Sequence, residues 1–334
     1  MASESQNTNL AESVRHNIVS VSGGKDSTAL LLLAIERNTE NLQAVFADTG
    51  HEHPTTIGYI EYLNAEVFPI KTIKADFSER IMKKRKRLEL IAAGEPDPVN
   101  RKMKYPWTPE SAERALKVLH PTGNPFLDLC LLNGLFPSTR TRWCSKELKR
   151  DLMITQVNFP LMEQGHEVYS WQGVRRDESL ARRDLSELDE VGGGLWNYRP
   201  ILDWTAEDCF AMHKKHGVKH NPLYELGMSR VGCMPCIHAT KNEILEISKR
   251  FPEELERVKE WERLVAEASP LSAATFFPVT RIEKDIKSHE IDTEKHGIDS
   301  QVAWAKTGRG GKDIDMFKAE EEPALCSSIY GLCE

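Results

Sequence analysis

The stretch that decides the fold reads Asn17-Ile-Val-Ser-Val-Ser-Gly-Gly-Lys-Asp-Ser-Thr28. Residues 17–22 are predicted to form a short buried strand, and the apolar run at 29–35 to form a helix. Between them, Gly23 and Gly24 carry no Cβ, so backbone N–H groups can converge on an anion. The helix directs its N-terminal amides and dipole at the same point. This strand, turn and helix therefore predict a phosphate-binding loop.

The side chains of this loop suit a pyrophosphate group. Ser22, Ser27 and Thr28 offer hydroxyl donors, and Lys25 offers a positive charge. The loop is not a Walker A motif, because the G-x-x-x-x-G-K-S/T spacing is absent. An ordinary polar turn between a strand and a helix is the alternative. The gathering of seven suitable residues at one topological position favours the anion site.

The segments that follow continue the same alternation of elements. A second and a third strand are predicted at 42–47 and 66–70, with a helix at 55–63 between them. Residues 168–174 and 198–202 are candidates for further strands. This spacing is typical of a parallel sheet with right-handed crossovers. We therefore expect an α/β fold with a doubly wound parallel sheet.

Patterning also predicts how the chain is divided. Capping boxes at Thr205–Asp208 and Thr240–Glu243 mark two helix starts. The Gly-rich, basic stretch 305–312 is predicted to be a loop. The expected parts are a flexible leader (1–16), a nucleotide-binding domain (17–240) with a mostly helical insertion (76–140), and a helical C-terminal extension that carries a cysteine tail (241–334).

Composition excludes several classes of protein. The 334 residues are 40% hydrophobic and 28% charged, which fits a globular protein with a real core rather than a disordered chain, a fibre or a coiled coil. The net charge of −7 argues against a general nucleic-acid coat protein. No stretch approaches the ~18 apolar residues of a membrane span. The polar N-terminus has no signal-peptide pattern, so a cytoplasmic setting is expected.

The SGGKDS loop, followed by Asp-Thr-Gly at residues 48–50, resembles the PP-loop, or adenine nucleotide alpha hydrolase, superfamily. That resemblance implies a PP-loop type of sheet and a bound adenine nucleotide. Asp48, Thr49 and Gly50 would border the nucleotide. The residues implied to contact phosphate are Ser22, Gly23, Gly24, Lys25, Asp26 and Ser27, of which Lys25 and Asp26 are also the catalytic candidates.

Later segments narrow the resemblance to the phosphoadenylyl-sulfate (PAPS) reductase family. These are Arg142-Trp-Cys-Ser-Lys-Glu-Leu-Lys149, Gly173-Val-Arg-Arg-Asp-Glu-Ser-Leu-Ala-Arg182, Arg199–Thr205, Asn221–Gly227 and Gly232-Cys-Met-Pro-Cys236. The resemblance runs from about residue 17 to 240 and implies that Gly173, Arg175, Arg176 and Arg182 gather on the anionic groups of the nucleotide. Guanidinium groups fork onto phosphate or sulfate oxygens better than ammonium groups do. The alternative is an exposed basic face paired with neighbouring acids.

Seven cysteines in a reducing compartment indicate metal ligands or reactive thiols rather than disulfides. In family members with a [4Fe–4S] cluster, a cysteine before the basic segment and a later C-x-x-C are ligands. The resemblance therefore implies a cluster held by Cys144, Cys233, Cys236 and, as the fourth ligand, Cys326. Trp143 stands where those members have a tandem cysteine. Zinc and uncoordinated redox thiols remain alternatives, whereas Cys130 and Cys209 are predicted to be core packing.

The cysteine tail supplies a candidate nucleophile. Sulfonucleotide reductases attack the substrate sulfur with a C-terminal cysteine in a Glu-Cys-Gly segment, which makes Cys333 a catalytic candidate. The tail Cys326-Ser-Ser-Ile-Tyr-Gly-Leu-Cys333-Glu334 has those residue types in another order. Either cysteine can be the nucleophile, or both can belong to the metal site.

The leading hypothesis is a PAPS reductase-family enzyme that binds ATP or a sulfonucleotide and performs sulfur chemistry. The nucleotide can bring Mg²⁺ with it. The expected co-reactant is a thiol or protein reductant or a sulfur donor. The intact SGGKDS loop favours an alternative, an ATP pyrophosphatase that activates a nucleic acid or other target for sulfur insertion. A non-catalytic nucleotide-binding accessory protein is a second alternative. For the basic run Arg80–Arg87, a solvated helix face is preferred over a nucleic-acid contact. His51 and His53 fit a surface turn better than a metal site.

Overall fold

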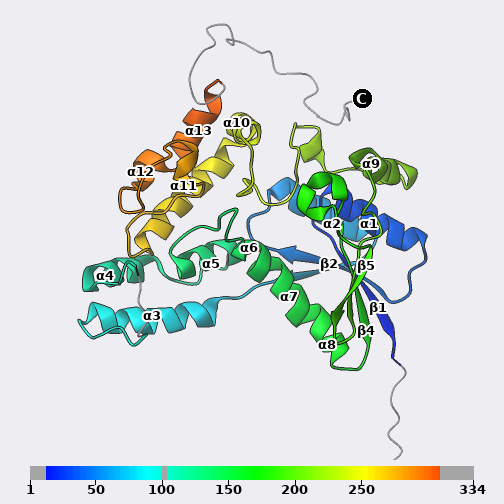
Figure 1. Cartoon of the computed structure of the whole chain (residues 1–334), viewed down its shortest axis with the longest axis horizontal. Coiled ribbons are helices and arrows are strands. Elements are labelled where there is room, and N and C mark those ends of the chain that lie inside the picture. Colours follow the sequence, from blue (N-terminus) through cyan, green and yellow to red (C-terminus); the bar gives the residue numbers. More distant parts are fainter. Residues whose placement is uncertain (1–12, 100–103, 309–334) are drawn as a thin grey trace, which may run out of the picture. The chain divides into compact units, whose positions relative to one another are not determined.

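A computed structural model describes residues 13–99 and 104–308 of the chain. Its central feature is a six-stranded sheet in the order β3-β2-β1-β4-β6-β5. Figure 1 labels β1, β2, β4 and β5 of this sheet. Strand β1 pairs in parallel with β2 and β4, and β4 pairs in parallel with β6. The edge strand β5 runs antiparallel to β6. The expected α/β fold with a mostly parallel sheet is confirmed.

Apart from β5, the strands overlap their predicted positions, with shifts of a few residues. They are β1 (Arg15–Ser20), β2 (Leu42–Asp48), β3 (Ile70–Lys74), β4 (Glu167–Trp171), β5 (Leu188–Gly192) and β6 (Leu195–Tyr198). Strand β1 begins inside the predicted leader, and residues 1–12 of that leader lie outside the described residues. The third strand begins at Ile70, where it was expected to end, because the preceding helix continues to Glu66. Strand β5 was not predicted, since its exposed residues show no apolar periodicity.

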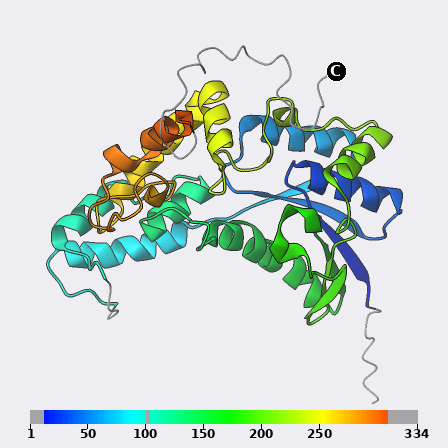
Figure 2. The ribbon, with the colours of Figure 1, turned by 45° about the horizontal axis from the view of Figure 1, so that its top comes forward.

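Contacts between residues divide the chain into two compact units. The first contains residues up to Ala47, Tyr59–Ile73 and Leu152–His220. In it, α1 (Lys25–Glu36) contacts β1 and α9 (Ala206–Lys215) contacts α1; Figure 2 shows these helices in a second view. Its core includes Ile18, Val19 and the leucines of α1, all fully or nearly fully buried. The division of the chain at residue 240 stays a prediction.

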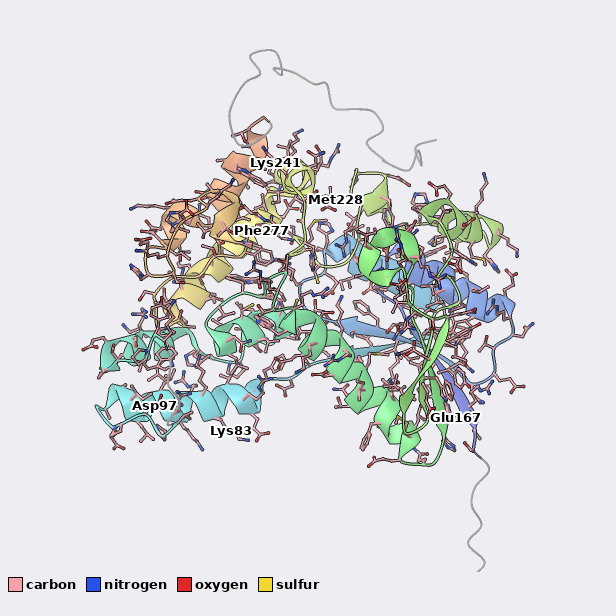
Figure 3. The ribbon with its side chains drawn as sticks, in the orientation of Figure 1. Lys83, Asp97, Glu167, Met228, Lys241 and Phe277 are labelled. Carbon is pink, nitrogen blue, oxygen red and sulfur yellow. The ribbon has the colours of Figure 1, made fainter. Side chains whose placement is uncertain are left out.

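The second unit contains Asp48–Gly58, Lys74–Asp151 and the chain from Asn221 onward. The expected helical insertion forms α3 (Ser78–Ala92), α4 (Pro109–Val118) and α5 (Pro125–Asn133). Helices α10 (Lys241–Arg250), α11 (Pro252–Glu267), α12 (Thr293–His296) and α13 (Ile298–Lys306) follow. Apart from α12, which has no buried residue, these helices contribute to one apolar core, which includes Phe277, labelled in Figure 3.

Further helical segments connect these elements. Helix α2 (Pro54–Glu66) follows β2, and a run from Trp143 to Met162 contains α6 (Trp143–Ser145), α7 (Asp151–Met153) and α8 (Phe159–Met162) separated by two π-helical turns. Both predicted capping boxes are present, because Thr205 caps α9 and Thr240 caps α10. Within the described part of the chain, no helix has the length and apolar character needed to cross a membrane.

Candidate functional site

The SGGKDS loop joins β1 to α1 and is shaped by its own polar groups. Gly23 has φ +75°, a left-handed conformation that favours glycine, and Gly24 precedes the first turn of α1. The Ser22 backbone N–H donates to Ser27 Oγ at 3.0 Å, and Ser27 Oγ–H donates to the Gly24 carbonyl at 3.0 Å. The Ser27 hydroxyl therefore holds the turn closed, and anion binding by the first amides of the helix stays a prediction.

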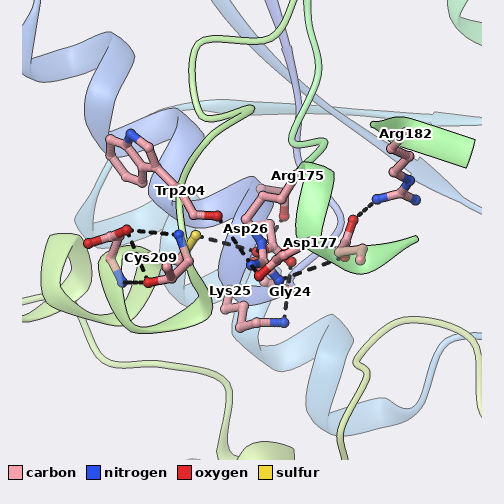
Figure 4. A network of polar contacts seen from close by, with 12 residues as sticks. Gly24, Lys25, Asp26, Arg175, Asp177, Arg182, Trp204 and Cys209 are labelled. Atoms are coloured by element: carbon pink, nitrogen blue, oxygen red, sulfur yellow. Dashed lines mark hydrogen bonds and ion pairs between the residues drawn. The ribbon is translucent and has the colours of Figure 1, made fainter. Parts of the chain in front are cut away.

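The two charged residues of the loop are buried and paired. Lys25 is 5% exposed, and its Nζ lies 3.4 Å from a carboxylate oxygen of Asp26. The other Asp26 oxygen accepts a hydrogen bond from Nε of Arg175 at 2.6 Å and lies 3.4 Å from Sγ of Cys209, as Figure 4 shows. Burial alone would lower the pKa of Arg175, but the nearby Asp26 raises it. The loop thus carries a compensated carboxylate rather than a free one.

The predicted anion-binding arginines are engaged in contacts within the first unit. Arg175 is 4% exposed and also bonds to Asp177 at 2.6 Å. Arg176 donates to the carbonyl of Leu185 at 2.8 Å and pairs with Asp203. Arg182, labelled in Figure 4, pairs with Glu178. Pairing with neighbouring acids is the alternative that the sequence left open. Their role as nucleotide ligands stays a prediction.

Gly173 brings the backbone of the arginine segment against the loop. A Cβ built on this glycine would lie 3.3 Å from the Asp26 carbonyl carbon and 3.3 Å from the Ser27 nitrogen. Such contacts are tighter than ordinary van der Waals packing, so only glycine permits this approach without movement. Gly173 was predicted to belong to the nucleotide site, and the structure places it in direct contact with the loop.

Two residues of α9 touch the same helix turn. The buried Cys209 was predicted to be core packing; it is fully buried, and its thiol also reaches Asp26. One turn later, Nε2 of His213 lies 3.0 Å from the Lys25 carbonyl oxygen. Burial raises the pKa of the Cys209 thiol and lowers the pKa of His213, so both are neutral groups. The sequence offered no signal for these contacts beyond the capping box that begins α9.

In the second unit, the Asp48–Gly50 turn packs on the N-terminus of α5. The side-chain amide of Asn124, which caps α5, donates to the Gly50 carbonyl at 2.6 Å, and the Phe126 N–H donates to the Thr49 carbonyl at 2.9 Å. Gly50 has φ +74°, and a Cβ there would approach Asn124 to 2.7 Å. The turn is therefore fixed by local packing, and its contact with a nucleotide stays a prediction.

A buried carboxylate joins this turn to the C-x-x-C segment. Glu52 has a side chain that is only 2% exposed and accepts hydrogen bonds from the Thr49 hydroxyl at 2.7 Å and the Thr49 N–H at 3.1 Å. The Cys233 thiol donates to Glu52 at 3.7 Å, and Lys149 Nζ lies 3.8 Å from it. Sequence patterning assigned no role to either residue: Glu52 belongs to no spaced motif, and Lys149 was noted only as the last residue of the cysteine segment Arg142–Lys149.

Electrostatics connect the three predicted thiol ligands through one lysine. Burial opposes the charge on Lys149, yet its pKa is raised because Cys233, Glu52, Cys236 and Cys144 lie near it. Burial raises the pKa of Cys233 to about 12, so that thiol is protonated unless a cation displaces the proton. Cys233, Cys236 and Lys149 line a small cavity of ≈ 140 Å³.

The thiols in the described part of the chain do not form a metal site by themselves. Among residues 13–99 and 104–308, no three His, Cys, Asp or Glu side chains gather closely enough to hold a metal ion. The described donors therefore do not fit a cluster as they stand. The two remaining expected residues, Cys326 and Cys333, lie outside the described part of the chain, as do residues 309–312 of the predicted basic loop.

Two histidines that were expected on a surface turn belong to the core. His51 is 1% exposed, stacks on Phe126 with ring centroids 4.4 Å apart, and places Nε2 at 2.8 Å from the Pro235 carbonyl. Burial lowers the pKa of His51 to about 3, so it is neutral. His53 is 7% exposed. The surface-turn interpretation is wrong, because His51 anchors the C-x-x-C segment to the aromatic core.

The basic run Arg80–Arg87 lies on α3, and much of its charge is used internally. Lys84 donates to the Leu132 carbonyl at 2.9 Å, Arg85 donates to the Leu119 carbonyl at 2.8 Å, and Arg87 pairs with Asp97 at 2.5 Å. Burial lowers the pKa of Lys84 to about 8. The preferred solvated face holds for exposed residues such as Lys83, labelled in Figure 3, but not for the run as a whole.

Comparisons with known proteins show which family the chain resembles. The sequence profile of the phosphoadenosine phosphosulfate reductase domain matches residues 16–239. An uncharacterized 37.8 kDa protein of Escherichia phage 186 is 49% identical over 328 residues, covering 95% of this chain and 96% of the phage protein. Adenosine 5'-phosphosulfate reductase of Burkholderia cepacia is 33% identical over 99 residues, covering 29% of this chain and 40% of that enzyme.

Solved structures give a weaker likeness. The crystal structure of PAPS reductase from Candida auris, in complex with phosphate, matches with a TM-score of 0.38 and 17% identity. The match covers 67% of this chain and 83% of the Candida chain.

Proposed function

Because the chain belongs to the phosphoadenosine phosphosulfate reductase domain family, we propose that it is an enzyme that holds an adenine nucleotide at the SGGKDS loop and performs sulfur chemistry with its cysteines. The observation that carries the proposal is the loop itself. Gly23 and Gly24 open the backbone at the start of α1, and Lys25 supplies charge there. Helix N-termini of this kind bind phosphate through backbone amides and the helix dipole.

The cysteines define the expected chemistry. In the reductase form of the proposal, the thiolate of Cys333 attacks the sulfur of a sulfonucleotide, the sulfur–oxygen bond breaks, and adenosine phosphate leaves. A thiol or protein reductant then reduces the resulting cysteine–sulfur bond and releases sulfite. An iron–sulfur cluster on Cys144, Cys233, Cys236 and Cys326, with zinc as the alternative, stays a prediction, because the described thiols do not by themselves gather closely enough to hold a metal ion. The shared neighbour Lys149 supports this grouping, since an ammonium favours nearby anionic sulfur.

A second candidate is favoured by the complete SGGKDS sequence. An ATP pyrophosphatase needs a loop that holds the β- and γ-phosphates, whereas a sulfonucleotide lacks them. In this version ATP is cleaved to AMP and pyrophosphate to activate a nucleic acid or another acceptor for sulfur insertion. Because Lys84, Arg85 and Arg87 are used inside the second unit, contact with a nucleic acid at α3 would depend on its exposed cations, such as Lys83.

Anaerobic thermal-shift assays with ATP, adenylyl sulfate and PAPS test the proposal. A ligand at one hundred times its Kd stabilises the native state by about 2.7 kcal/mol, so a true substrate raises Tm clearly. Lys25→Ala should abolish the shift, while the exposed Lys83→Ala should keep it. Preference for a sulfonucleotide supports the reductase, and preference for ATP supports the pyrophosphatase. Binding without turnover supports the non-catalytic accessory protein. No shift with any of the three refutes nucleotide binding.

A further inference from the structure

An acidic side chain in a phosphate-binding loop poses an electrostatic problem. A free carboxylate at Asp26 would repel the phosphates that the loop is proposed to bind. In the structure both of its oxygens have cationic or hydrogen-bonding partners, namely Lys25 at 3.4 Å, Arg175 at 2.6 Å and Cys209 at 3.4 Å (Figure 4). The repulsion is therefore offset within the protein.

Arg175 has little capacity left for a second role. Its Nε is bound to Asp26, and its Nη1 to Asp177 at 2.6 Å and to the Trp204 carbonyl at 3.4 Å. Its Nη2 lies 4.0 Å from Glu178, and the side chain is 5% exposed. A buried guanidinium held on three sides by acids is built to hold Asp26, not to reach outward to a ligand.

Helix α9 completes the arrangement from another side. The Cys209 thiol donates to the same Asp26 oxygen that Arg175 binds, and His213, four residues later on the same face, contacts the Lys25 carbonyl. The capping box at Thr205 fixes where this helix begins. Two neutral side chains thus pin the first turn of α1, whose amides form the proposed anion site.

We propose that Arg175 and Cys209 are positioning residues that act on the bound nucleotide through Asp26, rather than by touching its phosphates. They neutralise and orient the Asp26 carboxylate, and so fix the direction of the Lys25 side chain and the first amides of α1. The assignment rests on the proposed nucleotide function of the loop. It differs from the sequence-based expectation, in which Arg175 binds the nucleotide directly.

A double-mutant cycle separates the two roles. ATP affinity is measured by calorimetry for the wild type, Arg175→Ala, Asp26→Ala and the double variant. If Arg175 acts through Asp26, its removal weakens binding roughly tenfold in the wild type but less than about twofold when Asp26 is already absent. An equal loss in both backgrounds means that Arg175 contacts the nucleotide, and this result would overturn the proposal.

Cys209 provides a second test with a conservative rescue. Serine keeps a donor for Asp26 and alanine does not, so Cys209→Ser should bind ATP within about twofold of the wild type while Cys209→Ala binds several-fold more weakly. Cys130→Ala is the matched control, because Cys130 is a fully buried thiol in the core of the second unit. Equal losses in the serine and alanine variants would show a packing role only and contradict the assignment.

Urea unfolding without nucleotide distinguishes this proposal from the proposed function. Relative to the wild type, the same three variants (Arg175→Ala, Asp26→Ala and the double variant) should show non-additive losses of stability, because the two groups form one buried pair. Additive losses overturn the pairing whatever the protein binds. The outcome is different if the variants lose stability non-additively but the wild-type protein binds none of ATP, adenylyl sulfate and PAPS. That result would uphold the contact between Arg175 and Asp26 and refute the nucleotide function.

Discussion

The substitution Gly173→Ala tests whether the close approach of the arginine segment shapes the nucleotide loop. The added Cβ would lie 3.3 Å from the Asp26 carbonyl carbon, 3.3 Å from the Ser27 nitrogen and 3.4 Å from the Asp26 carbonyl oxygen. Carbon contacts are optimal at about 3.5–4.0 Å, so the loop must move by a few tenths of an ångström. Gly173 is not in a left-handed conformation, so alanine brings steric contact without backbone strain.

The magnitude follows from the atoms that are displaced. Overpacking of a close contact costs about 1–3 kcal/mol, and we take the low end because one methyl group meets a loop rather than a core. The displaced Ser27 nitrogen belongs to the proposed anion-binding turn. We therefore expect ATP affinity to fall by about 1 kcal/mol, or roughly fivefold.

Isothermal calorimetry under anaerobic conditions measures this loss, and Gly58→Ala is the matched control. Gly58 lies within α2, and a Cβ there meets no atom within 4 Å. Alanine is favoured over glycine in a helix by about 1 kcal/mol, so this variant should gain stability and bind ATP normally. If Gly173→Ala binds ATP as tightly as Gly58→Ala does, the approach of residue 173 does not shape the nucleotide site and the reasoning fails.

Three further outcomes are expected. A colorimetric iron assay on anaerobically purified protein should find iron in the wild type and less in Cys236→Ser. The variant Cys130→Ala, which changes a buried core thiol, should keep its iron. An unchanged iron content in Cys236→Ser would remove Cys236 from the ligand set. Burial raises the pKa of Glu262 to about 7, above its ordinary 4.5, so its contribution to stability is complete below about pH 4.5 and roughly 3 kcal/mol is lost by about pH 7. Glu262→Gln should flatten that dependence in urea titrations. Arg87→Ala should lower the free energy of unfolding by about 1 kcal/mol, because it breaks the paired contact with Asp97. The exposed control Lys83→Ala should lower the free energy of unfolding by less than about 0.5 kcal/mol. Equal losses in the two variants would contradict the pairing.

Short-range sequence signals were sufficient to predict most of the strands and helix starts. The strand, the glycine turn and the helix at residues 15–36 follow from contiguous residues, since a buried strand, a left-handed Gly23 and a run of leucines each act within a few positions. The capping boxes at Thr205 and Thr240 were equally readable, because a cap and its partner are three residues apart. The shift of β3 and the missed β5 arise where edge strands lack a clear periodic pattern.

The partners of the charged and sulfur-bearing residues could not be read in this way. The sequence by itself determined the strand–loop–helix unit and the family, and it singled out the cysteines for examination. Only the tertiary structure decided that Arg175 pairs with Asp26, 149 residues earlier, that Cys209 joins them, and that Glu52 meets Cys233. The reason is physical: an arginine can satisfy its charge with any nearby acid, and which acid is nearby depends on how strands and helices distant in the chain pack together.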